Sequence, residues 1–198
     1  MKIVLATNNP HKVEEITRII KGIFPDSEIK TLKEIGFNEE IEETEETRMG
    51  NALLKAKTIS EKYNVFTISD DTGLEVDALG GRPGVYTARY AGEHCTAEDN
   101  IKKMLAEMKD VPLDKRSAKF RCVICGYFPD GKTIFGNGCV DGYITTETDG
   151  TKSFGYDPIF FSTELNKTFG VASAEEKDSV SHRARALKDF VSQMESKK

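Results

Sequence analysis

The sequence has no long hydrophobic run and no excess of positive charge. None of its apolar stretches approaches the ~18 residues that a membrane-spanning helix needs. The apolar start Met1–Ala6 is too short for a secretory signal. A net charge of −5 argues against a long nucleic acid as a partner, because phosphate-backbone binding needs a basic surface. We therefore expect a cytoplasmic protein that binds neither membranes nor nucleic acid.

Cysteine and histidine are also scarce, with four and three residues. Cys122 and Cys125 form a C-x-x-C pair, but they lie in the segment 118–128, whose residue types favour a strand. Side chains three residues apart on a strand point to opposite faces, and no second Cys/His pair completes a zinc site. We predict two strand cysteines without a metal or redox role. No Ser-His-Asp or Cys-His pairing is indicated either.

The composition is typical of a globular protein, with 38% hydrophobic and 31% charged residues among 198. Such a length suits one domain, or one domain with two lobes. Strand and helix patterns alternate early and a hairpin comes late, which predicts an α/β fold with a mixed sheet. The expected strands are Lys2–Ala6, Glu28–Leu32, Val65–Ser69, Ser117–Phe128 and Thr133–Thr146, and the expected helices begin at Pro10, Thr47, after Thr96 and near Ser181.

The turn Thr7–Lys12 joins the first strand to the first helix. Asn9 can cap this helix, and Pro10 suits its first position. Unpaired N–H groups and the helix dipole make such a terminus an anion site. Lys12 adds a cation in the first turn, where the helix itself disfavours one. The pattern fits a phosphate site, although an ordinary turn with a solvated lysine has the same sequence.

Asp70-Asp71-Thr72-Gly73 follows directly after an expected strand. Two adjacent carboxylates are costly to crowd unless a cation holds them, and Mg²⁺ prefers such hard oxygen ligands. A turn closed by Gly73 is the alternative interpretation. The acidic run from Glu39 to Glu46 could add a further metal ligand, and the sequence does not decide which residue that is.

Two later segments carry groups that could bind a nucleotide base. Phe154-Gly155-Tyr156-Asp157-Pro158 combines aromatic rings, which can stack on a base, with a carboxylate that can accept from a base N–H. Lys177 and Ser181-His182-Arg183 add cations near an expected helix start. A loop packed onto the core and a surface helix start are the structural alternatives.

These segments, in this order, strongly resemble the inosine/xanthosine triphosphate pyrophosphatase family, which acts on non-standard purine nucleoside triphosphates (dITP/XTP pyrophosphatases). The resemblance covers nearly the whole chain. Its markers are Leu5–Lys12, Glu42–Thr44 with Asn51–Ala56, Ser69–Leu74, Leu79–Tyr90, Phe154–Phe160 and Ser181–Arg183.

The resemblance implies a single domain over residues 1–198, with a mixed β-sheet, helices on both sides and two lobes around a central nucleotide-binding cleft. It implies a Mg²⁺-dependent homodimer that converts ITP, dITP and XTP to the monophosphate and pyrophosphate. Glu43 and Asp71 would bind the metal, and Asp71 would be the general base or only a metal ligand. The implied substrate contacts are Thr7, Asn8, Asn9, Pro10, His11, Lys12, Lys55, Thr72, Phe154, Gly155, Tyr156, Asp157, Lys177, His182 and Arg183.

The chain departs from the family pattern before the second helix. Many relatives have glutamate where this chain has Gly50, and Glu45 and Glu46 add two acids beside the proposed ligand Glu43. Thr72 stands where serine is more usual, which keeps the hydroxyl. Two other functions stay open, namely a pyrophosphatase for modified pyrimidines and a nucleotide-binding sensor that does not cleave.

Overall fold

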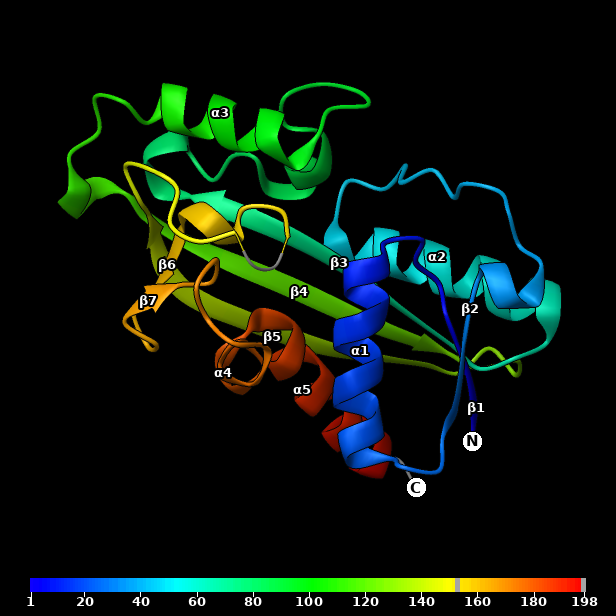
Figure 1. Cartoon of the computed structure of the whole chain (residues 1–198). Coiled ribbons are helices and arrows are strands. Elements are labelled where there is room, and N and C mark those ends of the chain that lie inside the picture. The colour runs from blue at the N-terminus through cyan, green and yellow to red at the C-terminus, as the bar shows by residue number, and fades with distance from the viewer. Residues whose placement is uncertain (152–153, 197–198) are drawn as a thin grey trace. The chain divides into compact units, whose positions relative to one another are not determined.

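The computed structural model of the chain describes residues 1–151 and 154–196 (Figure 1). Its strands form one mixed sheet in the order β2-β1-β3-β4-β5-β6-β7. Strand β1 is parallel to β2 and β3, whereas β6 is antiparallel to β5 and β7. The predicted α/β fold with a mixed sheet is thus confirmed. Within the described ranges, no helix is long and apolar enough to cross a membrane.

The elements have the following bounds. The strands are β1 (Lys2–Leu5), β2 (Glu28–Thr31), β3 (Thr67–Val76), β4 (Ser117–Tyr127), β5 (Thr133–Ile144), β6 (Phe160–Ser162) and β7 (Lys167–Thr168). The α-helices are α1 (Pro10–Ile23), α2 (Arg48–Tyr63), α3 (Ala97–Glu107), α4 (Ala174–Val180) and α5 (His182–Ser196). Short 3₁₀ helices are η1 (Lys33–Ile35), η2 (Asp77–Leu79), η3 (Gly84–Arg89), η4 (Leu113–Lys115) and η5 (Asp157–Ile159).

The chain divides into two compact units. The first unit comprises Met1–Asp71, Cys122–Gly138 and the residues from His182 on, and the second comprises Thr72–Arg121 and Cys139–Ser181. Strands β3, β4 and β5 therefore contribute residues to both.

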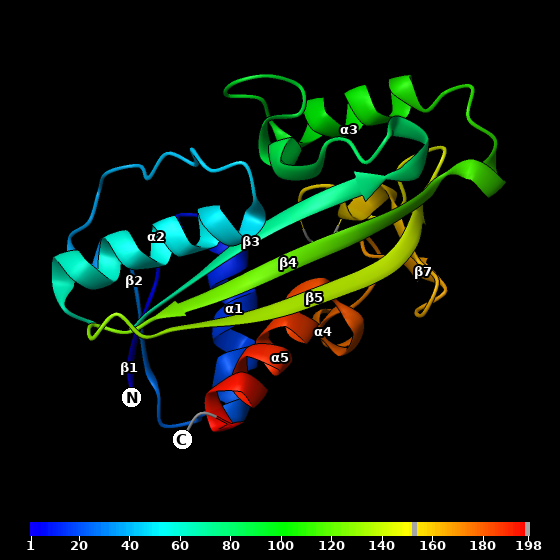
Figure 2. The ribbon, with the colours of Figure 1, turned by 180° about the vertical axis from the view of Figure 1, so that it is seen from behind.

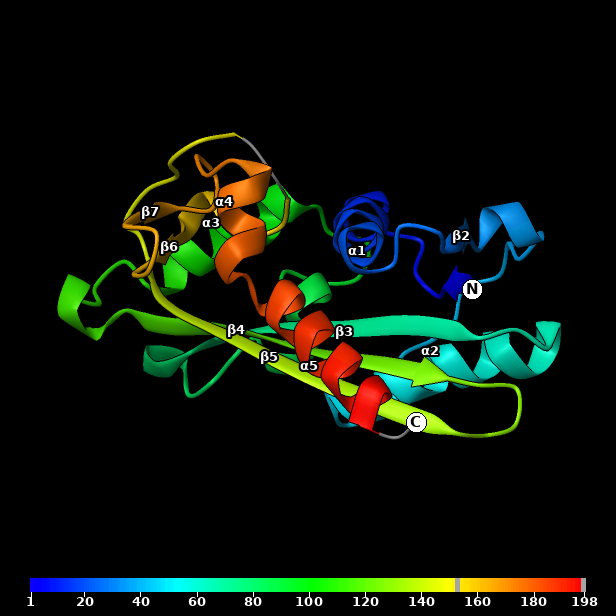
Figure 3. The same cartoon turned by 90° about the horizontal axis from the view of Figure 1, so that it is seen from below.

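In the first unit, helices cover both faces of the sheet (Figures 1 and 3). On β4, Cys122 packs in a cluster with residues of α1 and α5, while Cys125 packs in a cluster with Ala52 and Ala56 of α2. The two cysteines thus point to opposite faces, as their spacing predicts. Burial raises the pKa of the Cys125 thiol to about 12, so this side chain stays a protonated core residue.

The helix starts follow the capping chemistry of the sequence. Asn9 accepts at the start of α1 with Pro10 in the first turn, and the hydroxyl of Thr47 accepts from the Gly50 N–H at the start of α2. Thr96 forms a reciprocal capping box with Asp99 at α3. These three predicted helices are confirmed, and the hairpin β4–β5 closes through a hydrogen bond from Phe128 N to Lys132 O.

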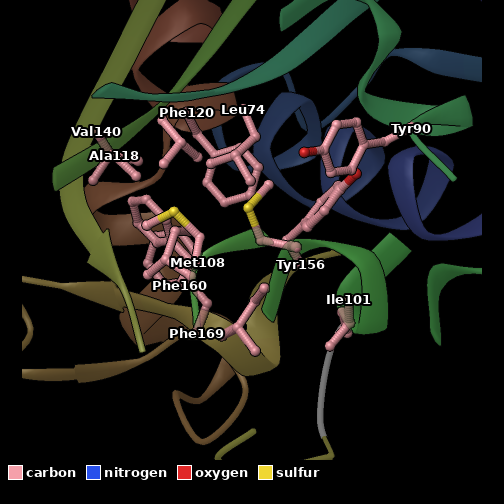
Figure 4. Packing of buried hydrophobic residues seen from close by; sticks show 14 residues of the cluster. Leu74, Tyr90, Ile101, Met108, Ala118, Phe120, Val140, Tyr156, Phe160 and Phe169 are labelled. Carbon is pink, nitrogen blue, oxygen red and sulfur yellow. The ribbon is translucent and has the colours of Figure 1, made fainter. Parts of the chain in front are cut away.

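The second unit has its own core, shown in Figure 4. Phe120 of β4, Phe160 of β6 and Phe169 stack or tilt on one another, and Met104 and Met108 of the α3 region fill the space beside them. Figure 2 shows α3 over the part of the sheet that this unit contains. The core supports the loop in which η5 lies.

Two parts of the predicted fold need correction. Strand β3 runs through Asp70-Asp71-Thr72-Gly73 to Val76, so these residues lie within a strand and not in a turn at its end. The neighbouring strand β1 stops at Leu5, which pairs with Ile68, so Asp70 and Asp71 lie just beyond the β1–β3 pairing, after Ser69. Helix α4 and the short strands β6 and β7 were not predicted, because none of them is long enough to show a hydrophobic period.

We expect Gly138→Ala to destabilise the protein by about 1–3 kcal/mol, the usual range for overpacking. Helix α5 lies against β5 at this glycine, and an added Cβ would collide with the carbonyl oxygen of His182 and the amide nitrogen of Ala186. Urea unfolding would measure the change. Gly22→Ala in α1 is the matched control, because nothing lies within 4 Å of its Cβ position. That change should leave stability unchanged or raise it; equal effects of the two substitutions would contradict the expected collision.

Candidate active site

Charged side chains of the first unit gather where β1 ends. Leu5 is the last residue of β1, and the turn from Thr7 to Asn9 leads from it into α1. Strand β3 continues past this point with Asp70 and Asp71. The carboxyl end of a parallel strand is where ligands collect in α/β proteins.

The N-terminus of α1 differs from the prediction in one respect. The N–H groups of His11 and Lys12 are not unpaired, because both donate to Oδ1 of Asn9, at 3.0 and 3.3 Å. The Asn9 N–H in turn donates to the hydroxyl of Thr7 at 3.2 Å. An anion at this turn would therefore be bound by the helix dipole and by side chains such as the Lys12 ammonium group, and not by these two N–H groups.

Asp70 is a fully buried carboxylate between two cations. Its Oδ2 lies 3.1 Å from Nζ of Lys12 and accepts from Nε and Nη2 of Arg183 at 3.3 and 3.2 Å. Burial alone would raise the pKa of Asp70, but Lys12 and Arg183 outweigh it and hold the pKa well below its ordinary value. Asp70 therefore stays ionised and fixes both cations.

Arg183 has a second carboxylate partner, which the sequence did not indicate. Its Nη1 donates to Glu15 of α1, and both side chains are buried. The predicted cation at the start of α5 is thus fixed in position by Asp70 and Glu15. Glu15 is buried on the same helix as the core residues Ile16 and Ile20. The sequence did not indicate its burial, because a glutamate in an amphipathic helix is normally exposed to solvent.

Asp71 shares a lysine with Glu43. Nζ of Lys55 lies 2.5 Å from Oε1 of Glu43 and 3.7 Å from Oδ1 of Asp71. Burial, Glu43 and Asp70 raise the pKa of Asp71 to about 6, although Lys55 and Lys12 act in the opposite direction. Lys55 neutralises Asp71 only partly because it lies closer to Glu43. Asp71 therefore titrates close to neutral pH.

Helix α2 positions Lys55, and the loop before α2 brings Glu43 to it. The hydroxyl of Ser69, next to the two aspartates, donates to the Ala52 carbonyl at 2.5 Å and ties α2 to β3. Glu42 is exposed, whereas Glu43 is half-buried against Lys55. Among the acids that the sequence left open, the structure thus brings Glu43 to Asp71.

The second unit contains a separate cluster around Lys177. Nζ of Lys177, on α4, lies 2.6 Å from Oδ2 of Asp157 and 4.8 Å from the ring centre of Phe154. The Phe154 N–H donates to the same Asp157 carboxylate at 3.2 Å, across Gly155 in a left-handed conformation. Tyr156 is buried, and its hydroxyl donates to the carbonyl of Thr87 at 2.7 Å. The predicted base-binding segment is thus a fixed loop.

The remaining predicted residues are distributed as follows. Asn8, Pro10 and His11 are exposed at the start of α1, Thr72 is half-buried in β3 and belongs to the second unit, and His182 is buried at the first position of α5. Glu15, by contrast, was given no role by the sequence, and Asp70 was considered only as one of two adjacent carboxylates for a cation. The structure shows that Asp70 holds Lys12 and Arg183 and that Glu15 holds Arg183.

Comparison with known proteins places this geometry in a family. A protein of Bacillus subtilis named dITP/XTP pyrophosphatase is 46% identical over 185 residues, which cover 93% of this chain and 92% of that protein. The structure of the Staphylococcus aureus Ham1 protein superposes with a TM-score of 0.87 at 39% identity over 100% of both chains. A Mycobacterium abscessus structure titled nucleoside-triphosphatase / dITP/XTP pyrophosphatase gives a TM-score of 0.75 at 36% identity, over 95% of this chain and 97% of that one. The Ham1 family model matches residues 3–193, and the chain belongs to the Ham1 family.

Proposed function

We propose that the protein hydrolyses non-standard purine nucleoside triphosphates (ITP, dITP and XTP) to the monophosphate and pyrophosphate, and so removes deaminated purines from the nucleotide pool. The observation that carries this proposal is that Glu43 and Asp71 both contact Lys55. The adjacent residue, Asp70, contacts Lys12. Carboxylates and lysines in this arrangement suit a metal-assisted attack on a phosphoric anhydride. The curated relatives named dITP/XTP pyrophosphatase support the substrate class.

Magnesium is the metal that we propose for Glu43 and Asp71. Among the described residues, no group of three or more His, Cys, Asp or Glu side chains is placed to hold a metal ion without further ligands. Oδ2 of Asp71 is nevertheless buried without a hydrogen-bond partner in the described part of the chain. Mg²⁺ takes one or two carboxylates plus substrate phosphates, so this donor set fits it. When bound, the ion would offset the charge that develops on the pyrophosphate leaving group.

The side chains have distinct roles in the proposed reaction. Asp71, with its pKa of about 6, accepts a proton from the water that attacks the α-phosphorus. As a metal ligand, the same side chain binds in its deprotonated form. Lys12 and Lys55 bind the triphosphate and balance its charge, as do the neighbouring groups of the turn from Thr7 to His11 and the hydroxyl of Thr72.

We propose that two segments contact the base of the nucleotide. The side chains and backbone of the Phe154–Asp157 loop, with Lys177, contact the purine ring, and His182 and Arg183 donate to its 6-oxo group. Adenine has a 6-amino donor at that position, and an unmatched donor pair costs about 2–3 kcal/mol or more. ATP is therefore a poor substrate.

The test is a substrate panel. The purified protein is incubated with ITP, dITP, XTP, ATP and GTP, with and without MgCl₂, and both pyrophosphate and monophosphate are assayed. Pyrophosphate from the first three only, and only with MgCl₂, is the expected result. Cleavage of modified pyrimidine triphosphates instead would change the substrate class. Tight nucleotide binding without pyrophosphate release would indicate that the protein is a nucleotide sensor and not an enzyme.

We further propose a cytoplasmic homodimer in which each chain forms one domain of two lobes. The family resemblance supports the dimer and the lobes. Light scattering of the purified protein tests the oligomeric state, and a mass equal to one chain at assay concentration would contradict the dimer.

We expect the affinity for Mg²⁺ to fall about tenfold per pH unit below pH 6 and to level off above pH 7. Metal binding needs the deprotonated carboxylate, and the pKa of Asp71 is about 6 in the metal-free protein. Calorimetric titration with MgCl₂ from pH 5.5 to 8 measures the affinity directly, and two buffers of different ionisation enthalpy count the protons released. A Mg²⁺ affinity that is constant over this pH range would mean that Asp71 is not a ligand of the metal.

A further inference from the structure

The loop between η1 and α2 has to place one glutamate among several that repel it. Residues 36–47 contain no helix or strand, and Glu39 to Glu46 include six glutamates. Glu43 approaches Asp71, which is unfavourable, because each carboxylate raises the cost of ionising the other. Glu39 pairs instead with Lys62, at 2.9 Å near the far end of α2. The position of Glu43 therefore needs support beyond its own contact with Lys55.

Asn51 supplies a fixed anchor for this loop. Its Oδ1 accepts from the backbone N–H of Glu45 at 2.9 Å, and its Nδ2 donates to the backbone carbonyl of Glu45 at 3.2 Å. Asn51 is 2% exposed. Its side-chain amide forms the same two hydrogen bonds with the Glu45 backbone that a neighbouring strand would form. Asn51 and Lys55 are four residues apart and lie on the same face of α2. This face of α2 therefore contacts the loop at two points: Asn51 binds the backbone of Glu45, and Lys55 binds the side chain of Glu43.

Gly50 makes room for the anchored loop. A Cβ at this position would lie 2.7 Å from Cβ of Glu45, a distance that Cβ atoms essentially never show, and 3.0 Å from its Cγ, which is a tight contact. Glycine costs up to about 1 kcal/mol inside a helix relative to alanine, and Gly50 lies in the first turn of α2. This cost has a local reason, because the Glu45 side chain packs where the missing methyl group would be.

We propose that Asn51 and Gly50 are positioning residues that fix the acidic loop at Glu45, so that Glu43 meets Lys55 and Asp71 in the geometry that binds the metal. The inference rests on the proposed role of Glu43 as a metal ligand. Glu43 lies two positions before the anchored residue Glu45, and two residue steps span at most about 7 Å. The anchor therefore limits how far the Glu43 carboxylate can move from Asp71.

The first test is Asn51→Leu, which keeps a side chain of similar size and removes both hydrogen bonds. Supporting groups around a metal site typically contribute 10- to 100-fold in affinity, so we expect the Mg²⁺ dissociation constant to rise at least about tenfold. It is measured by calorimetry with MgCl₂ and by the MgCl₂-induced rise in Tm, neither of which depends on turnover. Saturating MgCl₂ should restore most of kcat, because the ion itself draws Glu43 into place.

Ser60→Ala is the matched control on the same helix. Ser60 is buried and donates to the Val65 carbonyl at 2.7 Å, at the end of α2 remote from Asn51. Its loss should lower Tm without changing the Mg²⁺ dissociation constant. A parallel weakening of Mg²⁺ binding in Ser60→Ala would show that general loosening of α2 explains the result, and would overturn the proposal.

The second test does not depend on the folding of Asn51→Leu. Gly50→Ala should weaken Mg²⁺ binding about tenfold, because its methyl group displaces Glu45, while the helix preference of alanine offsets part of the cost in stability. Adding Glu45→Gly removes the colliding atoms and should restore Mg²⁺ binding. Wild-type affinity in Gly50→Ala, or no rescue by the second change, would overturn the proposal. Absence of Mg²⁺-dependent pyrophosphate release in the wild type would instead refute the proposed function itself.

Discussion

Asp71→Asn is expected to lower kcat by roughly 10²- to 10⁴-fold and, at the same time, to make the metal-free protein more stable. The first effect follows from the loss of the proton acceptor and of a charged metal ligand, since positioned acid–base groups contribute about this much. The second follows from the raised pKa of the carboxylate, about 6, which measures how much the folded protein disfavours its charge. We expect a gain on the order of 1–3 kcal/mol at pH 7.5.

The pH dependence identifies the cause of this gain. The folded pKa of Asp71 lies above the unfolded value of about 4, so the folded state binds the proton more tightly, and wild-type stability falls as pH rises from about 4 to about 6. Asparagine has no such titration. The advantage of Asp71→Asn over the wild type should therefore be small at pH 4, about half of its full size at pH 5 and full above pH 7, as measured by urea unfolding without metal.

Asp26→Asn is the control for the chemical change alone, because Asp26 is exposed in the same unit. It should alter neither kcat nor the pH dependence of stability. An inactive Asp71→Asn protein that is also less stable than the wild type would mean that the carboxylate is a structural group. The role as proton acceptor and ligand would then have to be abandoned.

The sequence allowed good prediction wherever local chemistry decides the structure. Asn9, Thr47 and Thr96 each begin a helix because their side chains accept from N–H groups that a helix start leaves unpaired. The odd spacing of Cys122 and Cys125 placed them on opposite faces because the period of a strand is two. Such features depend only on neighbours along the chain.

Features that depend on distant partners could not be predicted. Asp70-Asp71 was predicted to follow the end of a strand, because aspartates with a glycine two positions later are typical of turns. Strand β3 continues past the end of β1 because β4 still neighbours it in the sheet, and that is a tertiary effect. The burial of Glu15 depends on Arg183, which is 168 residues away. No local pattern marks such a pair, and neither residue is apolar.

The choice of metal ligand shows the same limit within a short segment. The six glutamates between Glu39 and Glu46 have the same charge and lie close together, so the sequence does not distinguish among them. Glu43 is singled out by Lys55, and the register of the loop against α2 depends on a side-chain amide bonding to the backbone. Side-chain to backbone bonds of this kind are common, but their partners become known only when the chain is folded.

Arg183→Met is expected to destabilise the protein by about 3–5 kcal/mol, the usual cost of removing one partner from a buried ion pair. Methionine fills much of the same volume, so the loss is chiefly electrostatic. Asp70 would keep Lys12 as a partner, while Glu15 would lose the guanidinium of Arg183. Urea unfolding at pH 7 measures the effect. Lys188→Met on the exposed side of α5 is the matched control and should change stability little.

Low pH and a second substitution should both reduce the loss of stability that Arg183→Met causes. The pKa of Asp70 is depressed in the folded wild type, so its contribution is full above the unfolded value of about 4 and is lost as pH falls through the folded pKa. Protonated carboxylates no longer need the cation, and the deficit of Arg183→Met should therefore shrink below about pH 4. Glu15→Gln removes the charge of the carboxylate that loses its contact with Arg183. The double variant should cost less than the sum of the single variants by roughly 0.5–3 kcal/mol. Strictly additive effects would mean that Arg183 stabilises the first unit by packing, and that Asp70 and Glu15 are not held as charges by it.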